Sequence, residues 1–87
     1  MAPPAPTLIH RTVVEILKDV SRRPIEPTLD SDLIADLGFD SLQVMETIAT
    51  LEDRFDISVP SDQVPANRTV AQVIASVGAL VESRQST

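Results

Sequence analysis

One serine lies where a glycine turn, a helix cap and the start of a helix are predicted to meet. Residues 36–46 read DLGFDSLQVME. Asp40 is a good N-cap, and Gln43 three residues later completes a capping box, in which each side chain can bond a free backbone N–H. Gly38 can adopt backbone angles closed to other residues, so the chain can turn sharply before the helix. The stretch therefore predicts a helix that begins at Ser41, with the serine hydroxyl uncovered.

A hydroxyl at this position suits covalent modification better than catalysis. A phosphate ester on Ser41 would lie near the free N–H groups and the positive end of the helix dipole, which favour an anion. The carboxylate of Asp40 would repel that ester and direct an attached group outward into solvent. A serine hydrolase needs a nearby base, but His10 is the only histidine and no G-x-S-x-G sequence is present. We expect a modified serine and no catalytic centre.

Other kinds of site are excluded by the residue types of the chain. There is no cysteine, which removes disulfides, thiol catalysis and thiolate metal sites. Asp30, Asp32 and Asp36 superficially suggest a calcium loop. However, Ile34 and Ala35 occupy the positions where the EF-hand loop needs a ligand and its glycine. No metal site is expected.

The composition indicates one small helical domain with an acidic surface. The chain has 87 residues, 43% of them hydrophobic, with neither Trp nor Tyr, so its core must consist mostly of Val, Ile and Leu. Thirteen acidic and seven basic residues give a net charge of -6, which repels nucleic acid and anionic lipid surfaces. No apolar stretch is long enough to cross a bilayer, and the N-terminal residues lack the features of a signal peptide. We expect a cytoplasmic monomer without stable membrane insertion.

Apolar residues at helical spacing predict three long helices, over 7–20, 41–55 and 69–83. Thr7 is the expected cap of the first helix, and a capping box of Thr69 and Gln72 begins the last. The core-facing stripes are Ile9, Val13, Leu17 and Val20, then Val44, Ile48, Leu51 and Phe55, then Val70, Val73, Ile74, Val77, Leu80 and Val81. This pattern predicts an all-α fold.

Gly78 lies inside the last predicted helix without ending its apolar periodicity. Glycine in a helix interior costs about 1 kcal/mol relative to alanine, because it loses more backbone freedom on folding. Two explanations are open at this point. Either another part of the chain packs closely against the glycine, or the helix is locally weak there.

Two connections join the predicted helices. The segment 21–40 is long for so small a domain, and such loops are more often functional than accidental. A short helical turn at 32–37 fits within it, and four apolar side chains are expected to anchor it to the core: Leu29, Leu33, Ile34 and Leu37. The prolines at both ends of 60–65 leave room for one short turn of helix. Residues 1–6 are expected to be a disordered tail and 84–87 a frayed one, so the domain spans 7–83.

The predicted second helix carries apolar residues on the face opposite its core stripe. Leu42, Met45 and Ala49 lie on that face, next to the carboxylates of Glu46 and Asp53. These apolar side chains could pack beneath the long loop, or they could form a docking surface for a partner. The sequence pattern leaves both interpretations open.

The residues around Ser41 resemble the attachment motif of the acyl carrier proteins. The family's Asp-Leu-Gly-x-Asp-Ser-Leu appears at 36–42, and the likeness continues through LEDRFDISVP at 51–60 and into Thr69-Val70. In helix order the resemblance covers about residues 7–83. It implies a four-helix bundle with three longer helices, a short third helix, and a long loop between the first two.

The resemblance also implies a cofactor and partners for a chain that is not itself an enzyme. A phosphopantetheinyl transferase would move 4′-phosphopantetheine from coenzyme A onto Ser41, beside its motif neighbour Asp40. The thiol of this arm would then carry acyl groups as thioesters. Five residues match family positions that meet the basic, partly apolar surfaces of acyl-transferring and synthase enzymes: Leu42, Met45, Glu46, Ala49 and Asp53.

Three residues depart from the pattern of fatty-acid carriers. Gln43 stands where an acidic residue is frequent, Thr47 at a usually apolar position, and Arg54 within an acidic run. Together with the proline-rich start, they point to a specialised carrier that serves a polyketide, lipid A or secondary pathway. Two alternatives to an acyl carrier are a peptidyl or aryl carrier of a nonribosomal system, against which Asp40 argues, and an acidic helical adaptor that is never modified.

Overall fold

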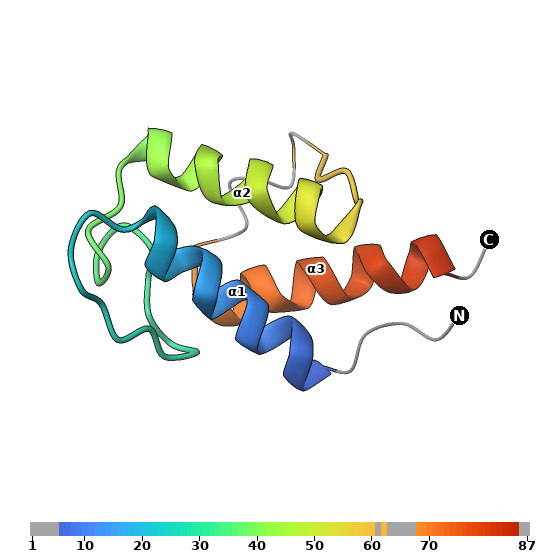
Figure 1. Ribbon diagram of the computed structural model, residues 1–87, viewed down its shortest axis with the longest axis horizontal. Helices are drawn as coiled ribbons and strands as arrows, with labels where there is room; N and C mark the ends of the chain where they lie inside the picture. Colours follow the sequence, from blue (N-terminus) through green and yellow to red (C-terminus); the bar gives the residue numbers. More distant parts are fainter. Residues whose placement is uncertain (1–5, 61, 63–67, 86–87) are drawn as a thin grey trace.

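A computed structural model describes residues 6–60, 62 and 68–85 of the chain. These ranges contain three helices, α1 (Pro6–Val20), α2 (Ser41–Phe55) and α3 (Val70–Gln85). Helix α1 packs against both other helices, which contact each other less, and the long loop connects α1 to α2 at one end of the bundle (Figure 1). The described ranges contain no strand, only an isolated bridge between Asp32 and Thr69. The predicted all-α class is therefore confirmed.

Helix boundaries differ slightly from those predicted. Helix α1 begins at Pro6, so Thr7 lies inside the helix and is not its cap. Proline suits the first helical position because its φ is preset and the N–H that it lacks would have no helical partner there. Helix α3 continues to Gln85, two residues past the expected end at Ser83. The short helix expected within 60–65 falls largely on residues 61 and 63–65, outside the described residues.

Aliphatic side chains from all three helices and from the loops form one core. Val13, Leu17 and Leu51 are almost fully buried, as the predicted stripes require. The buried cluster consists of Ile9, Val13, Ile16, Leu17, Leu33, Leu37, Phe39, Leu51, Ile57, Val70, Val73, Val77 and Val81. Val20, Val44, Phe55, Ile74 and Leu80 lie partly buried against it. The stripes are thus confirmed, and Ile16, Phe39 and Ile57 are core residues that they did not include.

Only two of the four apolar anchors expected in the long loop are buried. Leu33 and Leu37 are 2% and 5% exposed, whereas Leu29 and Ile34 are 48% and 57% exposed. The reason is the predicted helical turn, which the structure contains: Asp36 N donates to Asp32 O at 2.9 Å. Residues four apart share one face of such a turn, so Leu33 and Leu37 point inward together while Ile34 points away.

The loop is also fixed through its backbone to the start of α3. The carbonyls of Leu29 and Ser31 accept hydrogen bonds from Ala71 N (3.0 Å) and Val70 N (3.1 Å). These are N–H groups of the first turn, which have no partner within their own helix. The predicted capping box serves the next residues, since Gln72 N donates to Thr69 Oγ1 at 3.2 Å and Thr69 N to Gln72 Oε1 at 3.0 Å. Leu29 thus anchors the loop through its carbonyl and not through its side chain.

The two glycines have opposite surroundings. A Cβ added to Gly78 would meet nothing within 4 Å, so no other part of the described chain packs closely on it. Of the two explanations for Gly78, local weakness of the helix is therefore the one that fits. Gly38 has φ +74°, in the left-handed region that other residues enter only with strain. The turn before Ser41 needs its glycine, and the last helix does not.

Replacing each glycine by alanine should therefore shift stability in opposite directions. Gly78→Ala should raise the free energy of unfolding by about 0.5–1 kcal/mol, because alanine fits the helix and restricts the unfolded chain. Gly38→Ala should lower it by about 1–2 kcal/mol through strain at positive φ. Urea unfolding followed by circular dichroism measures both variants. A less stable Gly78→Ala protein would show that the helix needs its glycine after all.

Candidate functional site

The predicted capping box forms at the start of α2. Asp40 has extended backbone angles, its Oδ1 accepts a hydrogen bond from Gln43 N at 2.8 Å, and its own N–H donates to Gln43 Oε1 at 3.1 Å. Ser41 is the first helical residue, and its side chain is exposed. The N–H groups of Ser41 and Leu42 have no hydrogen-bond partner among the described residues. The serine thus lies beside free donors at the positive end of a helix.

A turn and a buried aromatic ring place this helix start. Gly38 N donates to Ile34 O at 3.1 Å and Phe39 N to Leu33 O at 2.9 Å, so the turn of the loop continues up to the glycine. Phe39 is only 2% exposed, whereas its neighbours Gly38 and Asp40 are exposed. The buried ring fixes the chain to the core two residues before Ser41. The hydrogen-bonded turn and the buried ring therefore hold the backbone that leads to Ser41, and the serine lies at the surface.

Gln43 does more than cap its own helix. Its side chain is 7% exposed, and Nε2 donates a hydrogen bond to the carbonyl of Val20 at 3.3 Å. Val20 is the last residue of α1, and carbonyls at a helix end lack partners in their own helix. One amide side chain therefore serves the start of α2 through its oxygen and the end of α1 through its nitrogen. Sequence reasoning identified the cap but missed this second bond.

Thr47, one turn further along α2, is 1% exposed. Its Oγ1 donates to Gln43 O at 2.8 Å, which satisfies the hydroxyl inside the core. No buried side-chain nitrogen or oxygen of the described residues lacks a hydrogen-bond partner. Gln43 and Thr47, two of the three residues that depart from the fatty-acid pattern, thus face inward, while the third, Arg54, is exposed.

The opposite face of α2 is open to solvent. Leu42 and Met45 are 61% and 55% exposed, so the interpretation that they pack beneath the long loop is wrong. Glu46, Ala49 and Asp53 are exposed beside them. This outer face of α2, consisting of Leu42, Met45, Glu46, Ala49 and Asp53, has two large apolar side chains and two carboxylates.

The acidic residues of the loop have structural partners. The carboxylate of Asp32 accepts hydrogen bonds from Ala35 N at 2.8 Å and Ile34 N at 2.9 Å, and these bonds, with Arg68 at 3.7 Å, hold its pKa below the ordinary value. Asp36 Oδ2 accepts from Asp32 N at 2.7 Å. No group of three or more His, Asp or Glu residues in the described ranges is arranged to hold a metal ion. These carboxylates stabilise the turn that precedes Gly38.

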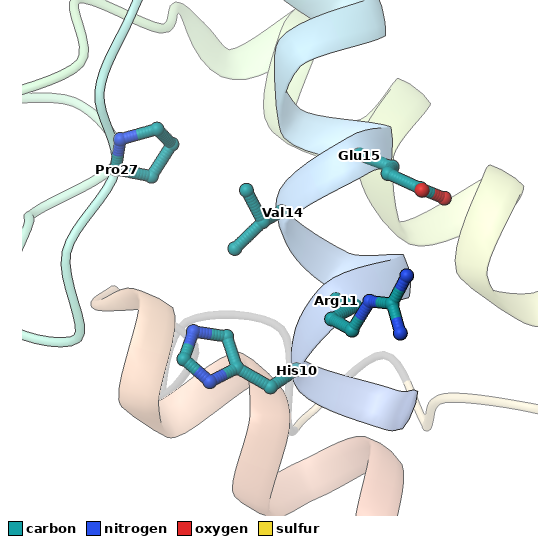
Figure 2. A pocket seen from close by; sticks show the side chains of 5 residues that line it. All are labelled: His10, Arg11, Val14, Glu15 and Pro27. Atoms are coloured by element: carbon teal, nitrogen blue, oxygen red, sulfur yellow. The ribbon is translucent and has the colours of Figure 1, made fainter. Parts of the chain in front are cut away.

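The single histidine lies apart from the serine. His10 lines an open hollow of about 370 Å³ together with Arg11, Val14, Glu15 and Pro27 (Figure 2). In Figure 2, His10 and Val14 extend toward the side of α1 that faces Pro27, and Arg11 and Glu15 toward the other side. Ser41 is not among the residues that line this hollow. His10 lies ten residues, about 15 Å along α1, before Val20, the end of the helix that bonds Gln43 near Ser41, so the structure does not bring together the base and the nucleophile that hydrolysis needs.

None of the helices in the described ranges has the length and apolar character to cross a membrane.

Removing the Gln43 side chain should cost more than removing its counterpart in α3. Gln43→Ala should lower the free energy of unfolding by about 2–3 kcal/mol, because it breaks the capping box, leaves Val20 O unpaired and opens a buried space. Gln72→Ala is the matched control, since it removes only exposed bonds at the start of α3, those that Gln72 Oε1 accepts from Thr69 N and Arg68 N, and it should cost about 1 kcal/mol. Urea unfolding gives both values. Equal losses would mean that the bond to Val20 does not stabilise the protein.

Comparison with known proteins gives consistent matches. Residues 11–77 match the sequence model of the family described as phosphopantetheine attachment site. An acyl carrier protein of Amoebophilus asiaticus is 43% identical over 67 residues, which are 76% of this chain and 84% of that protein. A solved structure assigned as an acyl carrier protein of Mycobacterium tuberculosis has a TM-score of 0.78 at 31% identity, covering 82% of this chain and 96% of that one. The hexanoyl carrier protein of the Streptomyces coelicolor actinorhodin polyketide synthase gives 0.67 at 28% identity, covering 86% and 87%.

Proposed function

The chain belongs to the acyl carrier protein family, and from this premise we propose that Ser41 carries the 4′-phosphopantetheine arm. Members of the family are carriers without catalytic activity, and the predicted cofactor is the one that the matched attachment-site family binds. The likeness to solved carrier structures also confirms the predicted four-helix bundle as the fold. The arm ends in a thiol, which supplies the thioester chemistry that a chain without cysteine lacks.

The observation that supports Ser41 best is its position as an exposed first residue of α2, beside two free N–H groups. The phosphodiester of an attached arm is an anion, and such a helix start stabilises an anion. Ser31, the nearest serine before it, differs in both respects. It is 9% exposed, and its Oγ accepts a hydrogen bond from Thr28 N at 2.9 Å. The residues around Ser41 therefore fit the arm, and those around Ser31 do not.

In the attachment reaction this chain supplies the nucleophile. Ser41 Oγ would attack the β-phosphorus of coenzyme A, forming an ester bond while the bond to the leaving 3′,5′-ADP breaks. The hydroxyl proton would pass to a base of the transferase, because the neighbouring Asp40 carboxylate already caps the helix by accepting from Gln43 N. The capping box and the buried Phe39 ring fix the backbone on either side of Ser41, which lowers the entropic cost of the reaction.

Intact mass measurement tests the proposal. Wild-type protein incubated with coenzyme A and a broad-specificity phosphopantetheinyl transferase should gain one phosphopantetheine. Ser41→Ala should gain none, whereas Ser58→Ala, which changes another exposed serine, should gain one as wild type does. A modified Ser41→Ala protein would overturn the assignment of the residue. If several transferases leave the wild type unmodified, the chain is better described as an unmodified adaptor.

The outer face of α2 is proposed to dock the partner enzymes, which include the transferase and the acyl-transferring and synthase enzymes. Its exposed leucine and methionine offer a small apolar centre, and Glu46 and Asp53 offer negative charge around it. The net charge of -6 attracts a basic partner surface from a distance. Charges at a rim mainly accelerate and orient association, while the apolar centre contributes contact energy. Such docking is weak enough for a carrier that must leave each enzyme.

Reversing one charge on this face should slow modification. Glu46→Lys should lower kcat/KM of the transferase for the carrier by roughly 5–10-fold at low salt, and less at high salt, because a rim attraction becomes a repulsion. Glu15→Lys is the control, since it makes the same charge change at an exposed position of α1. Both proteins should keep wild-type thermal stability. An equal effect of the two variants would show that only net charge matters.

The proposed cargo is an acyl intermediate of fatty-acid, polyketide or specialised lipid synthesis. The similarity to the actinorhodin carrier supports the polyketide possibility. The inward orientation of Gln43 and Thr47 weakens their use as signs of an unusual partner, because a partner cannot touch buried side chains. Arg54, which is exposed on α2, is the one departure that can alter the charge seen by a partner. No feature of the described residues favours a peptidyl or aryl cargo.

A further inference from the structure

One arginine lies against the turn that leads to Ser41. A Cβ built on Gly38 would come 2.5 Å from Arg23 Nη2 and 3.3 Å from Arg23 Cζ, so the guanidinium covers the backbone at Gly38. Gly38 and Ser41 are three residues apart, so their Cα atoms are separated by at most about 11 Å. The guanidinium therefore lies within about 15 Å of the Ser41 Cα, although Arg23 and Ser41 are 18 positions apart in the sequence.

A second, independent contact brings the same two segments together. The bond from Gln43 Nε2 to Val20 O at 3.3 Å joins the end of α1 to the first turn of α2. Ser21 then fixes the chain that leaves α1, because its Oγ donates to Arg23 O at 2.5 Å and accepts from Arg23 N at 3.3 Å. The backbone of Arg23 is thus held in place, and its long side chain extends from there to Gly38.

The guanidinium of Arg23 has no carboxylate partner. Among the described residues, the ion pair within 4.0 Å is that of Arg68 with Asp32, and Arg23 makes none. Glu26 and Asp36 line the same hollow of about 370 Å³ as Arg23, but Asp36 already accepts a backbone hydrogen bond at Oδ2. Arginine presents donors in a planar fork that suits phosphate oxygens. An exposed cation without a carboxylate partner therefore covers the turn that precedes the residue proposed to receive a phosphodiester.

We infer that Arg23 is a positioning residue that holds the phosphodiester of the arm once the arm is attached to Ser41. This inference rests on the proposed attachment. The phosphodiester adds a negative charge next to Asp40 in a chain whose net charge is already -6. Without a nearby cation, that charge should destabilise the protein through repulsion. Arg23 offsets the repulsion and draws the start of the arm toward the turn at Gly38.

The test compares apo and holo forms of four proteins at low and high salt. They are the wild type, Arg23→Gln, Arg23→Lys and Arg22→Gln, which removes a neighbouring exposed arginine. Intact mass first establishes that each holo form carries the arm. Thermal unfolding and the 31P chemical shift of the phosphodiester are then measured for each.

In wild type and Arg22→Gln, attachment should leave Tm unchanged or raise it at low salt, because Arg23 offsets the added charge. In Arg23→Gln, attachment should lower Tm by on the order of 2 °C, and the 31P shift should lose its salt dependence. Arg23→Lys should restore Tm while its 31P shift differs from wild type, since lysine keeps the charge without the fork.

Equal effects of attachment in wild type and Arg23→Gln, with both fully modified, would overturn the inference alone. A wild-type protein that gains no mass would overturn the attachment and this inference with it.

Discussion

The hydrogen bond from Gln43 to the carbonyl of Val20 joins the helix that begins at the proposed attachment site to the end of α1. Helix ends leave backbone groups without partners, and burying such groups unpaired destabilises a fold. Gln43 provides hydrogen-bond partners at two helix ends: its side-chain oxygen accepts from Asp40 N, and its side-chain nitrogen donates to Val20 O. The start of α2 is therefore fixed relative to α1, and with it the residue that begins α2, Ser41. The buried Phe39 ring and the turn at Gly38 fix the loop residues that lead into the same helix start.

Helix α2 separates structural and functional demands onto two faces. Its inner face includes Gln43 and Thr47, whose polar groups bond the backbone and so allow polar side chains inside a core. Its outer face exposes Leu42 and Met45, which a domain of this size could have buried. Large exposed apolar side chains need a reason, and partner docking is the one we propose. The residues that position the serine are thus different from those proposed to meet other proteins.

The sequence predicted those structural features that depend on residues close together in the chain. Both capping boxes, the positive φ of Gly38 and the helical turn at 32–37 follow from side chains within four residues of the backbone they bond. The sequence could not predict contacts between residues that are far apart in the chain. The bond from Gln43 to Val20 joins residues 23 apart in sequence, and the contact of Arg23 with Gly38 joins residues 15 apart. Hydropathy alone misplaced Leu29 and Ile34, because it ignores which face of a turn points inward.

The most direct test of this account is to locate the arm within the chain. Wild-type protein modified by the transferase would be cleaved with trypsin, and the fragment that spans the long loop and α2 sequenced by mass spectrometry under conditions that also detect release of pantetheine. We predict that the phosphopantetheine is on Ser41 and on no other residue of that fragment. An arm on Ser31, or on a fragment outside this region, would contradict the claim that the capped start of α2 is the attachment site.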